Sequence, residues 1–138
     1  MPGGAGPRTR RGTGGGGAGA SPEAGTSTLA DATTTLGELK EAVRRFTSER
    51  HWEPYHSPKN LVMALAVEAA ELMEPFLWLG TEESRRLADD PQRRAELADE
   101  LADVAFQLLN LSQTLGIDLS DAFAVKLAKN AQKYPVGG

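Results

Sequence analysis

The 138-residue sequence predicts an all-α protein, an antiparallel four-helix bundle whose subunits assemble into an oligomer. Three observations support this fold class. Apolar residues recur at helical spacing over long segments, cap and stop residues divide these segments into four helices, and no alternating run is long enough for a strand. Because the bundle is small and its second helix is apolar on nearly every side, we expect a second subunit to cover part of it.

Residues 1–34 differ in composition from the rest of the chain. They contain ten of the 15 glycines, together with Ala, Ser, Thr and Pro. Such a segment cannot bury enough apolar area to offset the entropy of ordering it, so we predict a disordered tail. Residues 35–138 form one domain. Its first helix is expected from Thr35, an N-cap with Glu38 as capping-box partner, to about Arg50.

The second predicted helix contains the two carboxylates on which the functional prediction depends. Ser57 is a suitable N-cap and Pro58 a suitable first residue, and the helix is expected to run to about Leu79. Glu68 and Glu71 lie within its apolar run, three residues apart and therefore on one face. A carboxylate on an apolar face costs several kcal/mol unless a cation, a hydrogen bond or a proton compensates it.

The third helix is expected from about Pro91 to Leu115, after a short helical turn over residues 81–90. Its apolar seam comprises Leu97, Leu101, Val104, Leu108, Leu111 and Leu115. Glu100 and Asp103 flank this seam at the same spacing of three, and Gln107 follows one turn later. Gly116 ends the helix, and Asp118 or Ser120 begins a fourth helix that ends near Lys133.

Two facing helices with a carboxylate pair each would form a site with four oxygen donors. Oxygen ligands favour Mg²⁺ or Mn²⁺, and the absence of Cys excludes thiolate zinc sites and thiol nucleophiles. Because Mg²⁺ in proteins usually completes its shell with substrate phosphates, an anionic substrate would be a polyphosphate. Paired carboxylates also occur by chance on acidic helices, as Glu96 and Asp99 illustrate.

Two further groups have an ordinary and a functional interpretation. Lys126, Asn130 and Lys133 share one side of the last helix, either to offset the helix dipole or to bind phosphate. Trp52 and Trp78, the two tryptophans of the chain, either pack in the core or enclose a flat base.

Charge and hydropathy exclude some classes of protein. The net charge of −4 argues against a general nucleic-acid binder. The longest apolar run before Glu68 is far too short to span a membrane, and the basic N-terminal residues are not followed by the apolar segment of a signal peptide. We therefore expect a cytoplasmic protein with no membrane partner.

The carboxylates form the pattern E-x-x-E, 28 residues, E-x-x-D, which resembles the MazG-like all-α nucleoside triphosphate pyrophosphohydrolases. The segment ERHWEPYHSPKNL, Trp78 and the terminal NAQKYPV are similar to the dCTP pyrophosphatase branch of that family. The resemblance covers roughly residues 36–136. Gln107 departs from it, because that branch often has Tyr at this position.

The resemblance implies a homo-oligomer, typically a tetramer, whose active sites use more than one chain. Its activity would be Mg²⁺-dependent hydrolysis of a nucleoside triphosphate, with dCTP or a modified dCTP expected, to the monophosphate and pyrophosphate, in nucleotide pool cleaning. The carboxylates Glu68, Glu71, Glu100 and Asp103 would be the catalytic metal ligands. The substrate would be bound by Trp52, His56, Trp78, Lys126, Asn130, Lys133 and Tyr134.

The attacking water would lose its proton to one of the four carboxylates or to Glu74, and Glu71 is favoured. Three alternatives remain open. They are the same chemistry on dUTP, phosphoribosyl-ATP or a damaged nucleotide, a non-enzymatic helical interaction module, and a structural bundle whose carboxylates are paired by lysines.

Overall fold

The computed structural model describes residues 28–137, and the regular structure among these residues is entirely helical. The α-helices are α1 (Leu36–Glu49), α2 (Pro58–Met73), α3 (Thr81–Arg86), α4 (Pro91–Thr114) and α5 (Leu119–Lys133). Short 3₁₀ helices are η1 (Glu53–Tyr55), η2 (Glu74–Phe76) and η3 (Leu87–Asp89). The predicted all-α class is confirmed.

The chain divides into two units, residues 1–35 and residues 36–138. In the first unit, the described residues form a turn in which the amides of Thr33 and Thr34 donate to the Ala30 carbonyl at 3.0 and 2.9 Å. The predicted disorder falls mainly on residues 1–27, which lie outside the described residues. All further observations concern the second unit.

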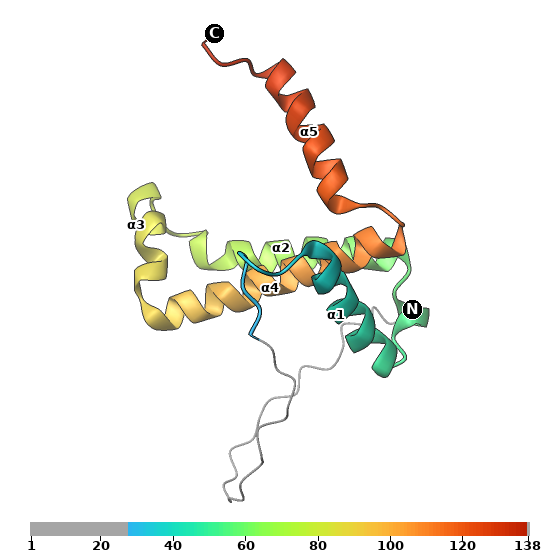
Figure 1. Cartoon of the computed structure of the whole chain (residues 1–138). Coiled ribbons are helices and arrows are strands. Elements are labelled where there is room, and N and C mark those ends of the chain that lie inside the picture. The colour runs from blue at the N-terminus through green and yellow to red at the C-terminus, as the bar shows by residue number, and fades with distance from the viewer. Residues whose placement is uncertain (1–27, 138) are drawn as a thin grey trace, which may run out of the picture. The chain divides into compact units, whose positions relative to one another are not determined.

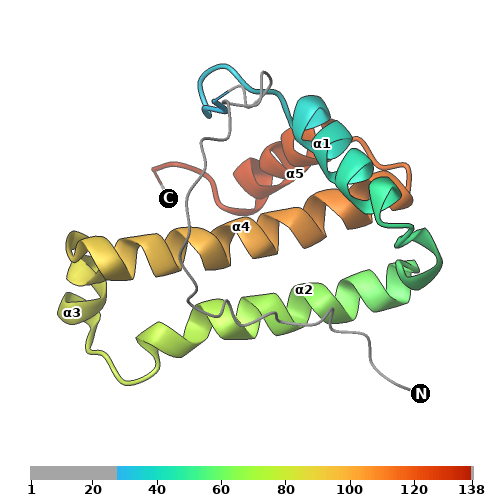
Figure 2. The same ribbon diagram turned by 90° about the horizontal axis from the view of Figure 1, so that it is seen from below.

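Helices α2 and α4 lie side by side and antiparallel, with α3 and η3 joining them at one end (Figures 1 and 2). Helix α1 packs against α4 near its other end. Leu61 of α2 is 1% exposed, and Val43 of α1 and Leu109 of α4 are also buried. The apolar core of one chain therefore lies where these three helices meet.

Side-chain caps fix the helix starts that the sequence predicts. The Ser57 hydroxyl accepts from the Asn60 amide at 3.2 Å at the start of α2. The Asp118 carboxylate accepts from the Asp121 amide at 2.9 Å at the start of α5. Each cap satisfies an amide that has no partner within its own helix. Gly116 follows α4 with a φ of +67°, a conformation that glycine adopts without strain.

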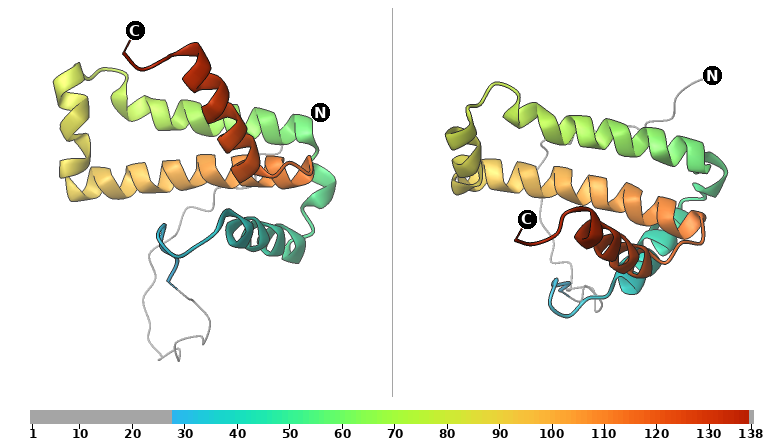
Figure 3. Two further views of the ribbon diagram at one scale, coloured as in Figure 1. Left: turned by 45° about the horizontal axis from the view of Figure 1, so that its top comes forward. Right: turned by 90° about the horizontal axis from the view of Figure 1, so that it is seen from above.

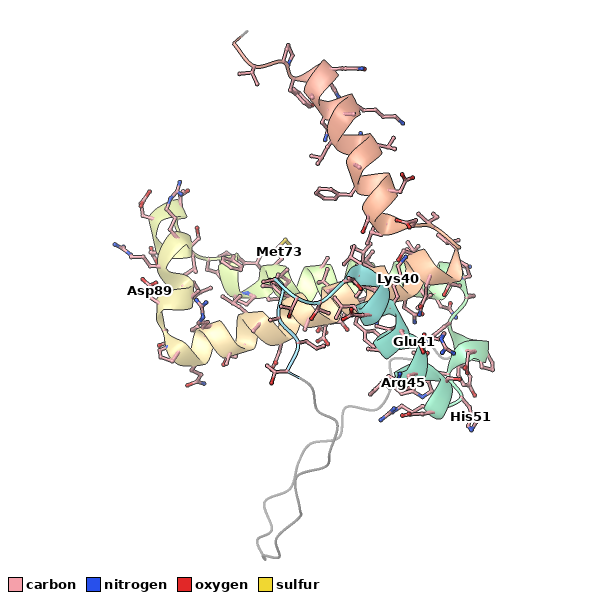
Figure 4. The ribbon with its side chains drawn as sticks, viewed as in Figure 1. Lys40, Glu41, Arg45, His51, Met73 and Asp89 are labelled. Carbon is pink, nitrogen blue, oxygen red and sulfur yellow. The ribbon has the colours of Figure 1, made fainter. Side chains whose placement is uncertain are left out.

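The second helix is shorter than the predicted range, which ended at Leu79. Helix α2 ends at Met73, labelled in Figure 4, and continues as the 3₁₀ helix η2. Pro75 explains the difference, because its nitrogen has no hydrogen to donate and its ring disfavours a continued α-helix. As a result, Trp78 follows the helical segment instead of ending it, and its side chain is 93% exposed.

Only part of the predicted seam of α4 is covered within one chain. Leu101, Leu108 and Leu115 are exposed, whereas the buried residues of this helix are Leu109, Asn110 and Ser112. Helix α4 therefore turns a different face towards α1 and α2 than the 4-3 spacing of leucines indicates. The exposed leucines are available to other packing.

Helix α5 leaves the end of α4 and points away from it (Figures 1 and 3). Its apolar side chains are open, with Phe123 64% and Leu127 55% exposed. The connector before it is held by Lys40 of α1, labelled in Figure 4, whose Nζ donates to the Ile117 carbonyl at 2.8 Å. Over residues 28–137, no helix has the length and apolarity that crossing a bilayer requires.

Candidate metal centre

The antiparallel packing of α2 against α4 brings carboxylates from both helices together. Glu68 and Glu71 come from α2 and Glu100 from α4. One carboxylate oxygen of each lies within 4.8 Å of the other two, and all three side chains are half-buried. Three of the four predicted metal ligands thus converge within a single chain.

Burial, together with the carboxylates around it, raises the pKa of Glu68 to about 7. These neighbours are Asp103, Glu71 and Glu100 in order of effect, and Glu71 also shares a hydrogen bond with Glu68. Every group that acts on Glu68 therefore disfavours its charge. This is opposite to the effect that a lysine partner would have, so Glu68 does not fit the alternative of a lysine-paired structural carboxylate.

The cluster fits a small divalent cation. Its donors are oxygens, and octahedral Mg²⁺ with bonds of about 2.1 Å would hold its ligand oxygens about 3.0–4.2 Å apart, within the 4.8 Å limit that the three carboxylates satisfy. Glu68 Oε2 is buried and has no hydrogen-bond partner, and the same holds for Gln107 Oε1. Buried oxygens without a donor are costly unless something else satisfies them, and a bound cation with its waters would do so.

Asp103 lies at the edge of this cluster. Its charge is the second cause, after burial, of the raised Glu68 pKa, but it is not one of the three residues whose oxygens converge. The Asp103 side chain is exposed. Asp103 is therefore near the centre without being part of its innermost group.

A pocket of about 380 Å³ extends from the carboxylate cluster between the end of α2 and the start of α4. It is lined by Glu71, Glu74, Pro75, Arg93, Glu96 and Glu100. The sequence suggested Glu74 only as an alternative proton acceptor and treated Glu96 as one of a chance pair of carboxylates. Both line this pocket, because the antiparallel pairing aligns the last turn of one helix with the first turns of the other.

Trp52 and His56 lie close together before α2. Their ring centroids are 5.8 Å apart, and the Trp52 ring also meets the edge of Phe46 at 5.6 Å. His56 Nδ1 forms a hydrogen bond of 3.1 Å with the side-chain amide of Asn110, and burial lowers the His56 pKa. Trp52 is half-buried, so it has packing contacts and part of its ring remains accessible.

Trp78 lies far from Trp52 in the same chain. The two residues flank opposite ends of α2, whose 16 residues span about 24 Å at 1.5 Å per residue. A single base is much smaller than this separation. One chain therefore does not enclose a base between its own two tryptophans.

The remaining predicted substrate contacts lie on α5 or directly after it. Lys126, Asn130, Lys133 and Tyr134 follow a helix that points away from α2 and α4 (Figure 1). Lys133 Nζ instead lies 5.3 Å from the centre of the Tyr134 ring. Within one chain, these residues are not brought to the carboxylate cluster.

Sequence reasoning did not identify two residues close to these groups. Asn110 is 4% exposed and forms a hydrogen bond with His56. The sequence feature that could have identified it is a polar residue between two leucines in an apolar helix. Arg93 lines the acidic pocket. The sequence feature that could have identified it is its position seven residues before Glu100, two helical turns away on the same face.

Comparisons with known proteins show which family the chain resembles in sequence and fold. A sequence model described as the MazG-like family matches residues 63–138. The chain is 39% identical over 102 residues to dCTP pyrophosphatase 1 of Mus musculus, covering 74% of this chain and 60% of that protein. It is 37% identical over 101 residues to dCTP pyrophosphatase 1 of Homo sapiens, covering 73% and 59%. The chain thus spans about 60% of the length of these relatives.

A solved structure, a pyrophosphatase from Archaeoglobus fulgidus, superposes with a TM-score of 0.69 at 34% identity. That match covers 78% of this chain and 99% of the archaeal one. The family match extends over more than half of the chain, and the structural match extends over nearly the whole archaeal protein. The chain belongs to the MazG-like family.

Proposed function

We propose that this chain is a Mg²⁺-dependent pyrophosphohydrolase that converts a nucleoside triphosphate, dCTP or a modified dCTP, to the monophosphate and pyrophosphate. The observation that carries the proposal is the convergence of Glu68, Glu71 and Glu100, with the Glu68 pKa raised to about 7 by burial and its acidic neighbours. The names of the relatives, dCTP pyrophosphatase 1, support the substrate class.

In this proposal Glu68, Glu71 and Glu100 hold the ion, and Asp103 completes the set from the edge of the cluster. When bound, Mg²⁺ neutralises charge on the phosphoanhydride and acidifies a bound water. The carboxylates also disfavour a substrate that lacks the ion, because their negative charge repels the triphosphate.

The net reaction adds one water across the anhydride between the α- and β-phosphates. The hydroxyl goes to one product, the bridging oxygen leaves with the other, and a proton is released. We assign acceptance of that proton to Glu71, which already shares a hydrogen bond with Glu68 and lines the pocket next to the cluster.

The base and sugar contacts require more than one chain. Trp52 and His56 form one element of the base site, and Trp78 reaches it from a second copy, because the two tryptophans of one chain flank opposite ends of α2, a helix about 24 Å long. Lys126, Asn130, Lys133 and Tyr134 on the extended α5 likewise serve the site of another copy. The proposed active unit is a homo-oligomer, with a tetramer implied by the resemblance.

Exposed apolar side chains on α2, α4 and α5 support the oligomer. Val67 and Leu101 are each 56% exposed, and Phe123 is 64% exposed. Phe123→Asp should lower the molar mass in sedimentation equilibrium, because a charge would then have to be buried in the interface. Gln132→Asp, with the same change in charge on an exposed position of α5, should leave the mass unchanged. An unchanged mass in both variants contradicts the role of α5.

The proposed activity is tested by pyrophosphate release from the common and modified dNTPs, with and without Mg²⁺. We expect Mg²⁺-dependent release, with the highest kcat/KM on a cytosine nucleotide. Glu71→Gln should reduce release below detection while the helical circular dichroism is retained, and Glu83→Gln on an exposed part of α3 is the matched control. Release by Glu71→Gln at the wild-type rate would refute the metal-ligand assignment. A preference for another base would leave the chemistry intact and correct the substrate.

A further inference from the structure

Arg93 is the one basic residue among the six that line the pocket beside the carboxylate cluster. The other lining residues are four glutamates and a proline, and no aromatic ring is among them. The pocket therefore offers no surface on which a base could stack. Its combination of carboxylates and one guanidinium suits a metal ion together with the phosphates that the ion carries.

The position of Arg93 is set by the start of α4. The Asp90 carboxylate accepts from the backbone amides of Gln92 and Arg93, at 2.9 and 3.0 Å, and so fixes the first turn of the helix. Arg93 precedes Glu100 by seven residues, about 10 Å along the helix axis and on the same face. Both residues line the same pocket, so phosphates carried by an ion at Glu100 can extend along it towards the guanidinium.

The present partner of Arg93 is exchangeable. Arg93 Nη1 donates to Glu96 Oε2 at 3.1 Å, and the two side chains are 57% and 46% exposed. Exposed pairs at this spacing contribute little stability, so a phosphate can replace Glu96 at low cost. An arginine can bind phosphate through two parallel hydrogen bonds, which a single carboxylate oxygen does not match.

The volume of the pocket agrees with a phosphate-bearing ligand. Its volume of about 380 Å³ lies within the range of small-molecule sites, roughly 300–1,000 Å³. The pocket also extends past the carboxylate cluster to Arg93, so its lining continues beyond the residues that would hold the ion.

We propose that Arg93 binds the β- and γ-phosphates of the nucleotide and holds the pyrophosphate product before its release. This assignment rests on the proposed function, since it places the cleaved anhydride at the carboxylate cluster. Glu96 competes for the same guanidinium and therefore weakens the binding of pyrophosphate. Arg93 thus contributes to retention of the product, and Glu96 lowers that contribution slightly.

The test measures binding of inorganic pyrophosphate in the presence of Mg²⁺ by isothermal titration calorimetry, using the full chain. Arg93→Ala should weaken binding about tenfold, the lower end for a charge-assisted hydrogen bond at a partly exposed site. Glu96→Gln should tighten binding about twofold, as expected from removal of an exposed competing ion pair. Arg94→Ala is the matched control, because Arg94 is an exposed neighbour that does not line the pocket. Circular dichroism melting verifies that each variant is folded.

In steady-state kinetics, Arg93→Ala should raise the inhibition constant of pyrophosphate and leave that of the nucleoside monophosphate unchanged. Equal binding of pyrophosphate by the wild type and Arg93→Ala overturns the proposal, even if the wild type hydrolyses dCTP. A wild type that does not bind pyrophosphate with Mg²⁺ also overturns it. A wild type that binds pyrophosphate through Arg93 but releases none from any nucleotide refutes the proposed function and supports the phosphate site.

Discussion

Replacing Glu68 by glutamine should stabilise the ion-free protein at alkaline pH and leave its stability at acidic pH nearly unchanged. The folded protein keeps a proton on Glu68 up to a pH of about 7, because its pKa is raised, whereas the unfolded chain loses that proton near 4.5. The folded wild type therefore loses stability as the pH rises from about 4.5 to 7, with the full loss above 7. Glutamine does not ionise, so the variant should not show this decline.

The size of the effect follows from the two pKa values. The difference between 4.5 and about 7, at 1.36 kcal/mol per pH unit, corresponds to roughly 3 kcal/mol. Because Glu68 is half-buried and solvent screens part of the interaction, we expect a measured gain of roughly 1–3 kcal/mol at pH 8. At pH 5 both side chains are neutral and can donate to Glu71, so the two proteins should differ by less than about 0.5 kcal/mol.

The assay is urea denaturation at pH 5 and pH 8, at one protein concentration, with EDTA and then with Mg²⁺. Mg²⁺ should stabilise the wild type at pH 8 and should stabilise Glu68→Gln much less, because the variant has lost a carboxylate ligand. Glu83→Gln on α3 controls for the removal of an exposed charge. Equal pH dependence of the wild type and Glu68→Gln would refute the argument that Glu68 is a buried carboxyl among acidic neighbours.

Three further substitutions test the packing around the site by urea unfolding. Leu61→Ala should lower the free energy of unfolding by about 2–5 kcal/mol, because Leu61 is 1% exposed. Val62→Ala, at a 51% exposed position, should lower it by less than about 1 kcal/mol. Equal losses in the two variants would contradict the described core. Asp90→Ala should cost about 1 kcal/mol through the loss of the two amide hydrogen bonds at the start of α4, and no change would indicate that water replaces the cap. Asn110→Ala should cost about 1–3 kcal/mol, because it leaves His56 Nδ1 without its partner in a partly buried site, and a neutral effect would show that this bond adds nothing to stability.

Local interactions made much of the fold predictable. The starts of α2 and α5 follow from Ser57 and Asp118, whose side chains bond to amides three residues away, so a short window of sequence contains both partners. The end of α2 was the exception. Pro75 interrupts a segment whose leucines, alanines and methionine favour a continued helix, and the outcome of that competition is not contained in the apolar pattern.

The pairing of Glu68 with Glu71 on α2 was predictable for the same local reason, whereas the approach of Glu100 depends on how α2 and α4 pack. Spacing of three on a helix puts Glu68 and Glu71 on one face, and a costly carboxylate in an apolar run indicates a compensating partner. The His56–Asn110 bond was not predictable, since it joins residues 54 positions apart in the sequence. The face that α4 presents to α1 and α2 also depends on tertiary packing, which spacing alone does not determine.

Because α5 has few contacts within its own chain, its folding depends on the surface that covers it. This helix has 15 residues, about the length at which a helix alone in water is only marginally formed, and it has few neighbours in its own chain to hold it. Whatever surface covers Phe123 and Leu127 therefore also supplies most of the free energy that keeps this segment helical. If that surface is another copy, dilution would unwind the last helix before it affects α2 or α4, and the lysines it carries would lose their fixed positions first.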